Sequence, residues 1–180
     1  MRFVETEVPG VIEVDLDLRS DDRGWFGRIW CEDEFAQAGL ASAWVQANQA
    51  HNPSRHTLRG LHLQRSPYGE VKYVRCTRGA LFDVAVDARP TSATFRAWVG
   101  RILTADEANG LYIPPGFAHG YLTLAEDTDL VYLTSRRYEP DAATGLRYDD
   151  PDLGIVWPAA PVRLSQQDRT WPLVADRSDL

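Results

Sequence analysis

Two short segments of the chain present a histidine in a setting that suits chemistry. Arg59–Gln64 reads Arg-Gly-Leu-His-Leu-Gln, which places His62 in a strand-like run. Pro114–His119 reads Pro-Pro-Gly-Phe-Ala-His and ends on His119. Neither segment supplies the second histidine that a transition-metal cage prefers. The two segments together favour organic acid/base chemistry inside a small barrel.

A metal site is the first alternative for these histidines. An imidazole-rich cage suits divalent transition metals, and it is often built from a His-x-His pair, a nearby Glu and a distant His. Gln64 stands at the place of the second histidine, so a cage would depend on His62, Glu70 and His119. Because an amide oxygen is a weak neutral ligand, this set is poor. We expect no metal and keep a metal-dependent enzyme as an alternative.

His62 is better suited to the role of a general base. A free imidazole has a pKa of about 6.5, so it can be neutral at pH 7 and accept a proton. Such a base needs a partner that orients its ring. A hydrogen-bonded interior histidine without a catalytic role is the competing interpretation.

The chain is predicted to be mainly β. Val11–Leu18 and Val71–Thr77 alternate apolar and polar residues, as half-buried strands do. Further strand-like runs, separated by Gly, Pro, Asn or Asp, are Ala80–Asp87, Phe95–Leu103, Leu111–Ile113, Gly120–Leu124 and Leu130–Ser135. Helix signals are limited to Glu32–Ala38 and a single turn after Thr104, where Glu107 has capping-box spacing. This pattern is typical of an antiparallel sandwich or barrel with a few short helices.

Length and charge narrow the class of protein. With 180 residues, 44% of them hydrophobic, we expect a single domain over residues 1–180, with a tail from about residue 139 packing on the barrel. The formal net charge of −7 argues against nucleic acid as the main partner. Only Cys31 and Cys76 are present, no apolar run approaches the roughly 20 residues of a membrane span, and no signal-peptide pattern is visible. We therefore expect a cytoplasmic protein without a membrane partner.

Several motifs together resemble one enzyme family. Besides the two histidine segments, they are Asp22–Phe26, Gln46–Asn48, Lys72–Arg75, Gly79–Asp87, Tyr132 with Tyr138, Asp150–Pro158, and Leu164–Ser165 with Asp168. In this order they resemble the dTDP-4-dehydrorhamnose 3,5-epimerase family, metal-free relatives of the cupins that invert stereocentres beside a ketone in nucleotide sugars. The resemblance implies an antiparallel jelly-roll (cupin-like) barrel, an epimerase without a cofactor, and a homodimer that exchanges its N-terminal strand.

The resemblance also implies roles for the catalytic residues. Asp168 stands at the position of the carboxylate that orients the base, and Tyr132 at that of the proton donor. Lys72 lies in an alternating strand, where an inward ammonium could stabilise the enolate formed beside a ketone. Each residue has a structural alternative: a helix N-cap or solvated acid for Asp168, a solvated lysine for Lys72, and a barrel-filling tyrosine for Tyr132.

By the same resemblance, a second group of residues binds the substrate. Arg59 would contact the diphosphate, which suits a guanidinium, although a surface salt bridge is the alternative. His119 would hydrogen-bond the sugar or a phosphate. The nucleoside end would be held by Arg23, Phe26, Gln46 and Asn48, with Phe26 and Tyr138 as stacking surfaces for the base.

The chain departs from the family pattern at the nucleoside end. Arg28 and Ala143 stand where the family has glutamates, and Gln167 stands where it has a lysine. These changes alter the charge and the hydrogen-bonding groups that would read a base. We expect an epimerase that inverts C3 and/or C5 of a nucleoside-diphosphate 4-keto-6-deoxyhexose, with a nucleotide that need not be dTDP. A non-catalytic sugar-nucleotide-binding module is the remaining alternative.

Overall fold

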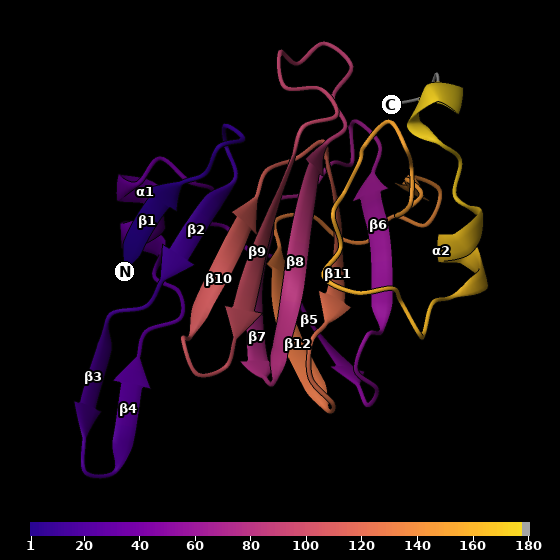
Figure 1. Cartoon of the computed structure of the whole chain (residues 1–180). Coiled ribbons are helices and arrows are strands. Elements are labelled where there is room, and N and C mark those ends of the chain that lie inside the picture. Colours follow the sequence, from indigo (N-terminus) through magenta and orange to yellow (C-terminus); the bar gives the residue numbers. More distant parts are fainter. Residues whose placement is uncertain (178–180) are drawn as a thin grey trace.

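Two antiparallel sheets face each other in the computed structural model, which describes residues 1–177 (Figure 1). The first sheet has the strand order β1 (Arg2–Glu5), β2 (Ile12–Asp15), β10 (Asn109–Ile113), β7 (Lys72–Arg78), β12 (Thr128–Thr134) and β5 (Gln46–Asn52). The second sheet has the order β13 (Ala143–Gly145), β6 (Leu58–Gln64), β11 (Phe117–Thr123), β8 (Ala80–Asp87) and β9 (Trp98–Thr104). The prediction of a mainly β chain with antiparallel sheets and short helices is confirmed.

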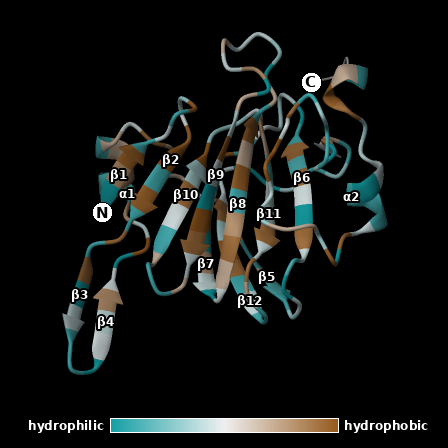
Figure 2. Cartoon of the chain, viewed as in Figure 1, coloured by the Kyte–Doolittle hydropathy of each residue, from teal (hydrophilic) through white to brown (hydrophobic). Residues whose placement is uncertain are grey.

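The main hydrophobic core lies between these sheets. Val74 and Leu130 contribute from the first sheet, and Leu81 and Val99 from the second; each is at most 1% exposed. Figure 2 shows hydrophobic residues along most of β8. Alternate residues of a strand point to the same face, so every second side chain enters this core. Burying each such aliphatic side chain stabilises the fold by roughly 1.5–3 kcal/mol.

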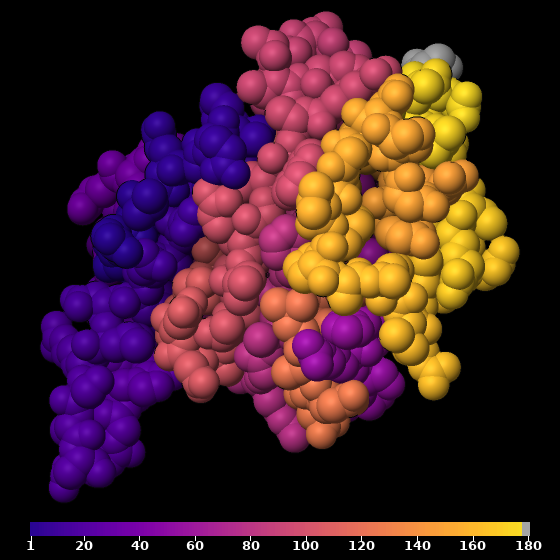
Figure 3. Space-filling model, viewed as in Figure 1, coloured from indigo at the N-terminus to yellow at the C-terminus, as the bar shows by residue number. Residues whose placement is uncertain are grey.

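The predicted strand Val11–Leu18 is wrong in its second half. β2 ends at Asp15, and β3 (Leu18–Asp21) leaves the sheet to pair with β4 (Gly24–Gly27) in a separate hairpin. Both halves keep the same two-residue alternation, so the pattern does not reveal the break between them. In the space-filling view this hairpin stands apart from the barrel (Figure 3).

Both helix signals are confirmed. Glu32–Ala38 is observed as α1 (Glu32–Gln37). After Thr104 the predicted single turn forms, with the amide of Glu107 donating to Thr104 Oγ1 at 3.0 Å and that of Ala108 donating to the carbonyl oxygen of Thr104 at 3.2 Å. The turn ends there because β10 begins at Asn109.

The C-terminal segment crosses the second sheet. β13 pairs with β6, α2 (Gln166–Thr170) contacts β6, and a short 3-10 helix (Val174–Asp176) follows. No helix in residues 1–177 has the length and apolar character needed to cross a bilayer. This route of the chain brings α2 next to the strand that carries His62.

Gly60 allows β6 to approach β11 closely. Its φ is +120°, and a Cβ there would lie 2.6 Å from the Cα of Gly120 and 2.7 Å from the carbonyl oxygen of His119. A side chain is therefore excluded by both backbone conformation and space. On these strands His62 pairs with His119, and the register shifts between His119 and Tyr121, opposite Gly60.

Candidate active site

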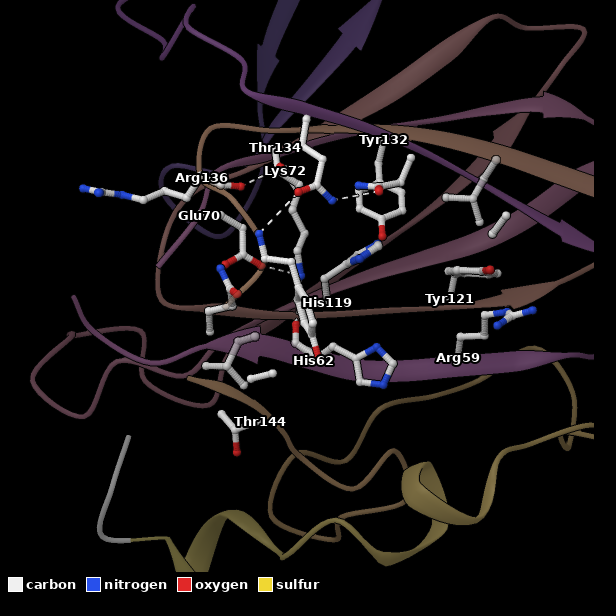
Figure 4. A pocket seen from close by; sticks show the side chains of 18 of the residues that line it. Arg59, His62, Glu70, Lys72, His119, Tyr121, Tyr132, Thr134, Arg136 and Thr144 are labelled. Carbon is white, nitrogen blue, oxygen red and sulfur yellow. Dashed lines mark hydrogen bonds and ion pairs between the residues drawn. The ribbon is translucent and has the colours of Figure 1, made fainter. Parts of the chain in front are cut away.

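A cavity of about 350 Å³ opens between the two sheets. Side chains that sequence analysis selected line it from both sides, and they are Gln46, Asn48, Lys72 and Tyr132 from the first sheet and Arg59, His62 and His119 from the second (Figure 4). In Figure 4 the labelled Tyr132 and His62 lie on opposite sides of this cavity. The two sheets thus bring together residues that are far apart in the sequence.

His62 is held by a buried carboxylate. His62 Nε2 lies 2.6 Å from Asp168 Oδ1, and the Asp168 side chain is 5% exposed whereas that of His62 is 46% exposed. Burial opposes ionisation of Asp168, but the hydrogen bond to His62 and further donors outweigh it, so the pKa of Asp168 lies below its usual value. Asp168 is therefore an ionised acceptor for a ring that is open to the cavity.

Local structure around α2 fixes the position of Asp168. Ser165 is the N-cap of α2, and its hydroxyl oxygen accepts from the amide of Asp168 at 3.0 Å. Trp171 follows α2, and its indole Nε1 donates to Asp168 Oδ1 at 3.2 Å. Gly145 makes room for Trp171, because a Cβ at that position would lie 2.5 Å from the indole nitrogen. The alternatives of a helix cap or a solvated acid for Asp168 are wrong.

Lys72 is a buried cation at the start of β7. Its Nζ lies 3.1 Å from Glu70 Oε1 and donates to the carbonyl oxygen of His62 at 3.1 Å. An ammonium has three donors, so one remains for a ligand in the cavity. The alternative of a solvated lysine is wrong, since the Lys72 side chain is 11% exposed.

Tyr132 carries a phenol that stays protonated at neutral pH. Burial raises the pKa of Tyr132, the charge of Glu70 raises it further, and Arg59 lowers it. Tyr132 pairs with Val74, and Lys72 pairs with Thr134 two residues along, so Lys72 and Tyr132 project from the same face of the sheet. The phenol can therefore donate a proton into the cavity that Lys72 also lines.

His119 has a partner that sequence analysis missed. Its Nε2 lies 2.8 Å from Oδ1 of Asp83, a fully buried residue of β8. The signal for Asp83 was present in the sequence as an acid in the middle of the apolar run of Ala80–Asp87. The three candidate metal ligands therefore have separate partners: His62 has Asp168, Glu70 has Lys72, and His119 has Asp83. Within residues 1–177 no three His, Cys, Asp or Glu side chains cluster as a metal site would require.

Comparison with known proteins assigns the chain to a family. The family model described as dTDP-4-dehydrorhamnose 3,5-epimerase matches residues 5–176. The dTDP-4-dehydrorhamnose 3,5-epimerase of Escherichia coli K12 is 41% identical over 159 residues, which are 88% of this chain and 85% of the relative. The chain belongs to the dTDP-4-dehydrorhamnose 3,5-epimerase family. This family consists of carbohydrate epimerases, so the prediction of an isomerase is confirmed.

Solved structures of family members agree with this fold. The dTDP-4-dehydrorhamnose 3,5-epimerase of Bacillus anthracis with TDP and PPi bound superimposes with a TM-score of 0.93 at 35% identity, covering 96% of this chain and 98% of that one. A 3'-monoepimerase from Streptomyces bikiniensis in complex with dTDP-quinovose gives a TM-score of 0.90 at 34% identity, covering 96% of this chain and 87% of that one. The jelly-roll prediction is confirmed.

Arg59, which the family resemblance places at the diphosphate, points into the cavity from β6. Its Nε donates to Asn52 Oδ1 at 2.9 Å, and the same oxygen accepts from the Tyr121 hydroxyl at 3.3 Å. Sequence analysis missed both partners, because an asparagine and a tyrosine in strands carry no spacing signal. Among the described residues Arg59 forms no ion pair, which removes the salt-bridge alternative.

Four further residues of the family's nucleoside end lie at the same cavity. Gln46, Asn48, Tyr138 and Gln167 line it, as does Ala143. Gln46 Nε2 donates to Asn48 Oδ1 at 2.9 Å, and the amide of Tyr138 donates to Gln46 Oε1 at 3.3 Å. Tyr138 is 63% exposed and leaves its ring free to stack.

Three nucleoside-end residues are not at the cavity of this chain. Arg23 and Phe26 lie in the β3–β4 hairpin and Arg28 follows it, and none of them lines the cavity. Phe26 is 71% exposed. Arg28 instead pairs with Glu34 Oε1 at 2.8 Å. One chain alone therefore does not assemble the complete set that the family pattern assigns to the nucleotide.

Proposed function

We propose that this chain inverts C3 and/or C5 of a nucleoside-diphosphate 4-keto-6-deoxyhexose by proton removal and return. The observation that carries the proposal is the placement of the His62–Asp168 pair opposite the half-buried Tyr132 in one cavity. A hexose ring between them would have a base on one side and an acid on the other. Inversion requires this arrangement, because the proton must leave one face of the ring and return on the other.

His62 acts as the general base on the carbon next to the ketone. Asp168, at 2.6 Å, fixes the ring orientation and stabilises the imidazolium that forms. The 46% exposure of His62 allows the abstracted proton to exchange with water afterwards. Proton transfer by a positioned side chain of this kind contributes about 10²–10⁴ in rate.

Lys72 stabilises the enolate. Removing a proton beside a ketone places negative charge on the ketone oxygen, and an ammonium already held in the cavity meets it without reorganisation. The contacts of Lys72 with Glu70 and with the His62 carbonyl hold the ammonium in place.

Tyr132 returns a proton from the opposite face. Its raised pKa keeps the phenol protonated, so it is available as an acid. C3 and C5 flank the same C4 ketone, so a change of ring orientation would present either carbon to the same pair of residues.

Arg59 and His119 bind the diphosphate and the sugar, and Gln46, Asn48, Tyr138 and Gln167 bind the nucleoside. We propose that a second copy of the chain completes this end. The projecting hairpin carries Arg23 and Phe26, together with Trp25 at 49% exposure, and in a homodimer with exchanged N-terminal strands it would reach the partner's cavity. A cytoplasmic location is part of the proposal, and the free thiols of Cys31 and Cys76 support a reducing compartment.

The relatives and this sequence differ in what they indicate about the base of the nucleotide. The relatives are named for dTDP sugars, whereas Arg28, Ala143 and Gln167 replace a glutamate, a glutamate and a lysine of the family pattern. A thermal-shift panel of dTDP, UDP, CDP and GDP would identify the base, because a ligand that binds the folded state raises its stability.

Incubation with a nucleoside-diphosphate 4-keto-6-deoxyglucose in deuterated water tests the reaction. Deuterium at both C3 and C5 identifies a 3,5-epimerase, and deuterium at one carbon identifies a mono-epimerase. A protein that binds the sugar nucleotide but labels neither carbon would be a binding module, and the proposal would be refuted.

A further inference from the structure

The cavity contains one acid that the proposed mechanism leaves without a role. Glu70 lies just before β7, and its side chain is 7% exposed. Among the described side chains that line the cavity, Glu70 is the one carboxylate. Its Oε1 contacts Lys72, whereas its Oε2 is buried and accepts no hydrogen bond from residues 1–177.

This carboxylate is poorly solvated, so its charge is felt strongly by its neighbours. A buried acceptor without a donor is uncommon in folded proteins, and low local polarity strengthens electrostatic interactions. Glu70 reaches two catalytic groups: it contacts the Lys72 ammonium at 3.1 Å, and its charge favours the neutral form of the Tyr132 phenol. The same acid therefore acts on the enolate-stabilising cation and on the proton donor.

We propose that Glu70 is a positioning residue: its carboxylate holds the Lys72 ammonium toward the reacting ketone and sets the charge of the cavity that Tyr132 also lines. This role rests on the proposed epimerase function. The ammonium bonds Glu70 on one side and the His62 carbonyl on another, so its remaining donor has one direction left. That direction is set by the protein before the substrate arrives.

The other titratable side chains that line the cavity are basic or phenolic. They are Arg59 and His62 on β6, Lys72 on β7, His119 and Tyr121 on β11, Arg136 after β12, and Tyr138. The positive charge of Arg59 lowers the pKa of Tyr132, whereas Glu70 raises it. Without Glu70 no described carboxylate would line the cavity to oppose Arg59.

The test uses two substitutions that separate the negative charge of Glu70 from the side-chain length that brings it to Lys72. Glu70→Gln keeps the shape and removes the charge, whereas Glu70→Asp keeps the charge and withdraws it from Lys72. The ionisation of Tyr132 is followed by NMR of carbon-13-labelled tyrosine in the free protein, with the Tyr132→Phe spectrum assigning the signal. We expect Glu70→Gln to lower the pKa of Tyr132 measurably and Glu70→Asp, which keeps the charge, to change it little.

Steady-state kinetics tests the second part of the proposal, the positioning of the Lys72 ammonium by Glu70. We expect both variants to lower kcat by roughly tenfold through the lost Lys72 contact, with KM within about threefold of wild type. The alkaline limb of the pH profile should move to lower pH in Glu70→Gln alone. Glu107→Gln is the matched control, because it removes a carboxylate from an exposed turn outside the cavity.

An unchanged Tyr132 titration in Glu70→Gln overturns the proposal, as does an unchanged kcat in both variants. These outcomes differ from failure of the proposed function, in which wild-type protein would label neither C3 nor C5. The tyrosine titration needs no substrate, so it judges the electrostatic role of Glu70 in either case.

Discussion

Asp168→Asn is the substitution that most directly tests the proposed catalytic pair of His62 and Asp168. The asparagine has nearly the same shape, so it can remain beside Ser165 and Trp171, which hold Asp168 in place. What is lost is the negative charge that faces His62 at 2.6 Å. The substitution therefore removes stabilisation of the imidazolium, which exists only after proton abstraction, and leaves the empty cavity nearly unchanged.

The magnitude follows from the geometry. A charge pair with a 2.6 Å contact has its charge centres about 4 Å apart, and at an effective dielectric constant near 20 its attraction is about 4 kcal/mol. The Asp168 side chain is 5% exposed, but the His62 side chain is 46% exposed, so water screens the pair in part and this figure is an upper limit. Loss of up to this energy from the transition state lowers kcat by about 10²–10³-fold. KM should change much less, since the neutral ground state does not depend on the pair.

The assay is the initial rate of deuterium incorporation at saturating sugar nucleotide, together with circular dichroism to confirm folding. Asp87→Asn is the matched control, because Asp87 is a fully buried aspartate that does not line the cavity. We expect its kcat to remain near wild type. A folded Asp168→Asn protein with less than about tenfold loss of kcat would refute the assignment of Asp168 as the partner of the base.

Other substitutions separate proton donation, helix placement and acid stability. Tyr132→Phe should lower inversion by at least about 10²-fold while thermal shift by the nucleotide persists, and loss of that shift would contradict a role confined to chemistry. Gly145→Ala would place a Cβ about 2.5 Å from the Trp171 ring, which donates to Asp168. We expect the displaced ring to alter the tryptophan fluorescence and to lower kcat roughly tenfold. An unchanged fluorescence spectrum would contradict this expectation, because it would show that Trp171 does not move. Burial opposes ionisation of Asp87, but hydrogen bonds from an arginine and two hydroxyls bring its pKa down to about 2. Its stabilisation is present above pH 4 and lost as pH falls towards 2, so Asp87→Asn should cost about 2 kcal/mol at pH 7 and little near pH 2, measured by urea unfolding. An equal cost at both pH values would contradict this assignment.

The sequence was sufficient where periodicity and chemistry agreed. Ala80–Asp87 is a strand with the predicted bounds, since its apolar run is closed by Gly79 on one side and followed by Arg89-Pro90 on the other. His62 and Lys72 could be identified because each is a polar residue within a patterned strand. Their meeting in one cavity required only that the two sheets of an antiparallel sandwich face each other.

The sequence did not predict contacts between residues that no spacing or periodicity connects. Nothing in the spacing of Asp83 and His119 pairs them, because their contact depends on the register of β8 against β11. The hairpin that carries Phe26 leaves the barrel after a two-residue break that keeps the strand period. The link between Glu70 and Lys72 is two residues long in sequence, yet its importance comes from burial, which the sequence does not state.

The arrangement of the two sheets explains why this fold suits inversion. A base and an acid on neighbouring strands of one sheet would face the same side of a bound ring, and they could only remove and return a proton on that face. His62 lies on β6 of the second sheet and Tyr132 on β12 of the first, so the sandwich itself separates them by the width of its interior. The core residues that keep the sheets apart, such as Val74 and Val99, therefore also set the distance across which the substrate must fit. If His62 and Tyr132 act as the proposed base and acid, enlarging or shrinking that core would alter catalysis without touching either side chain.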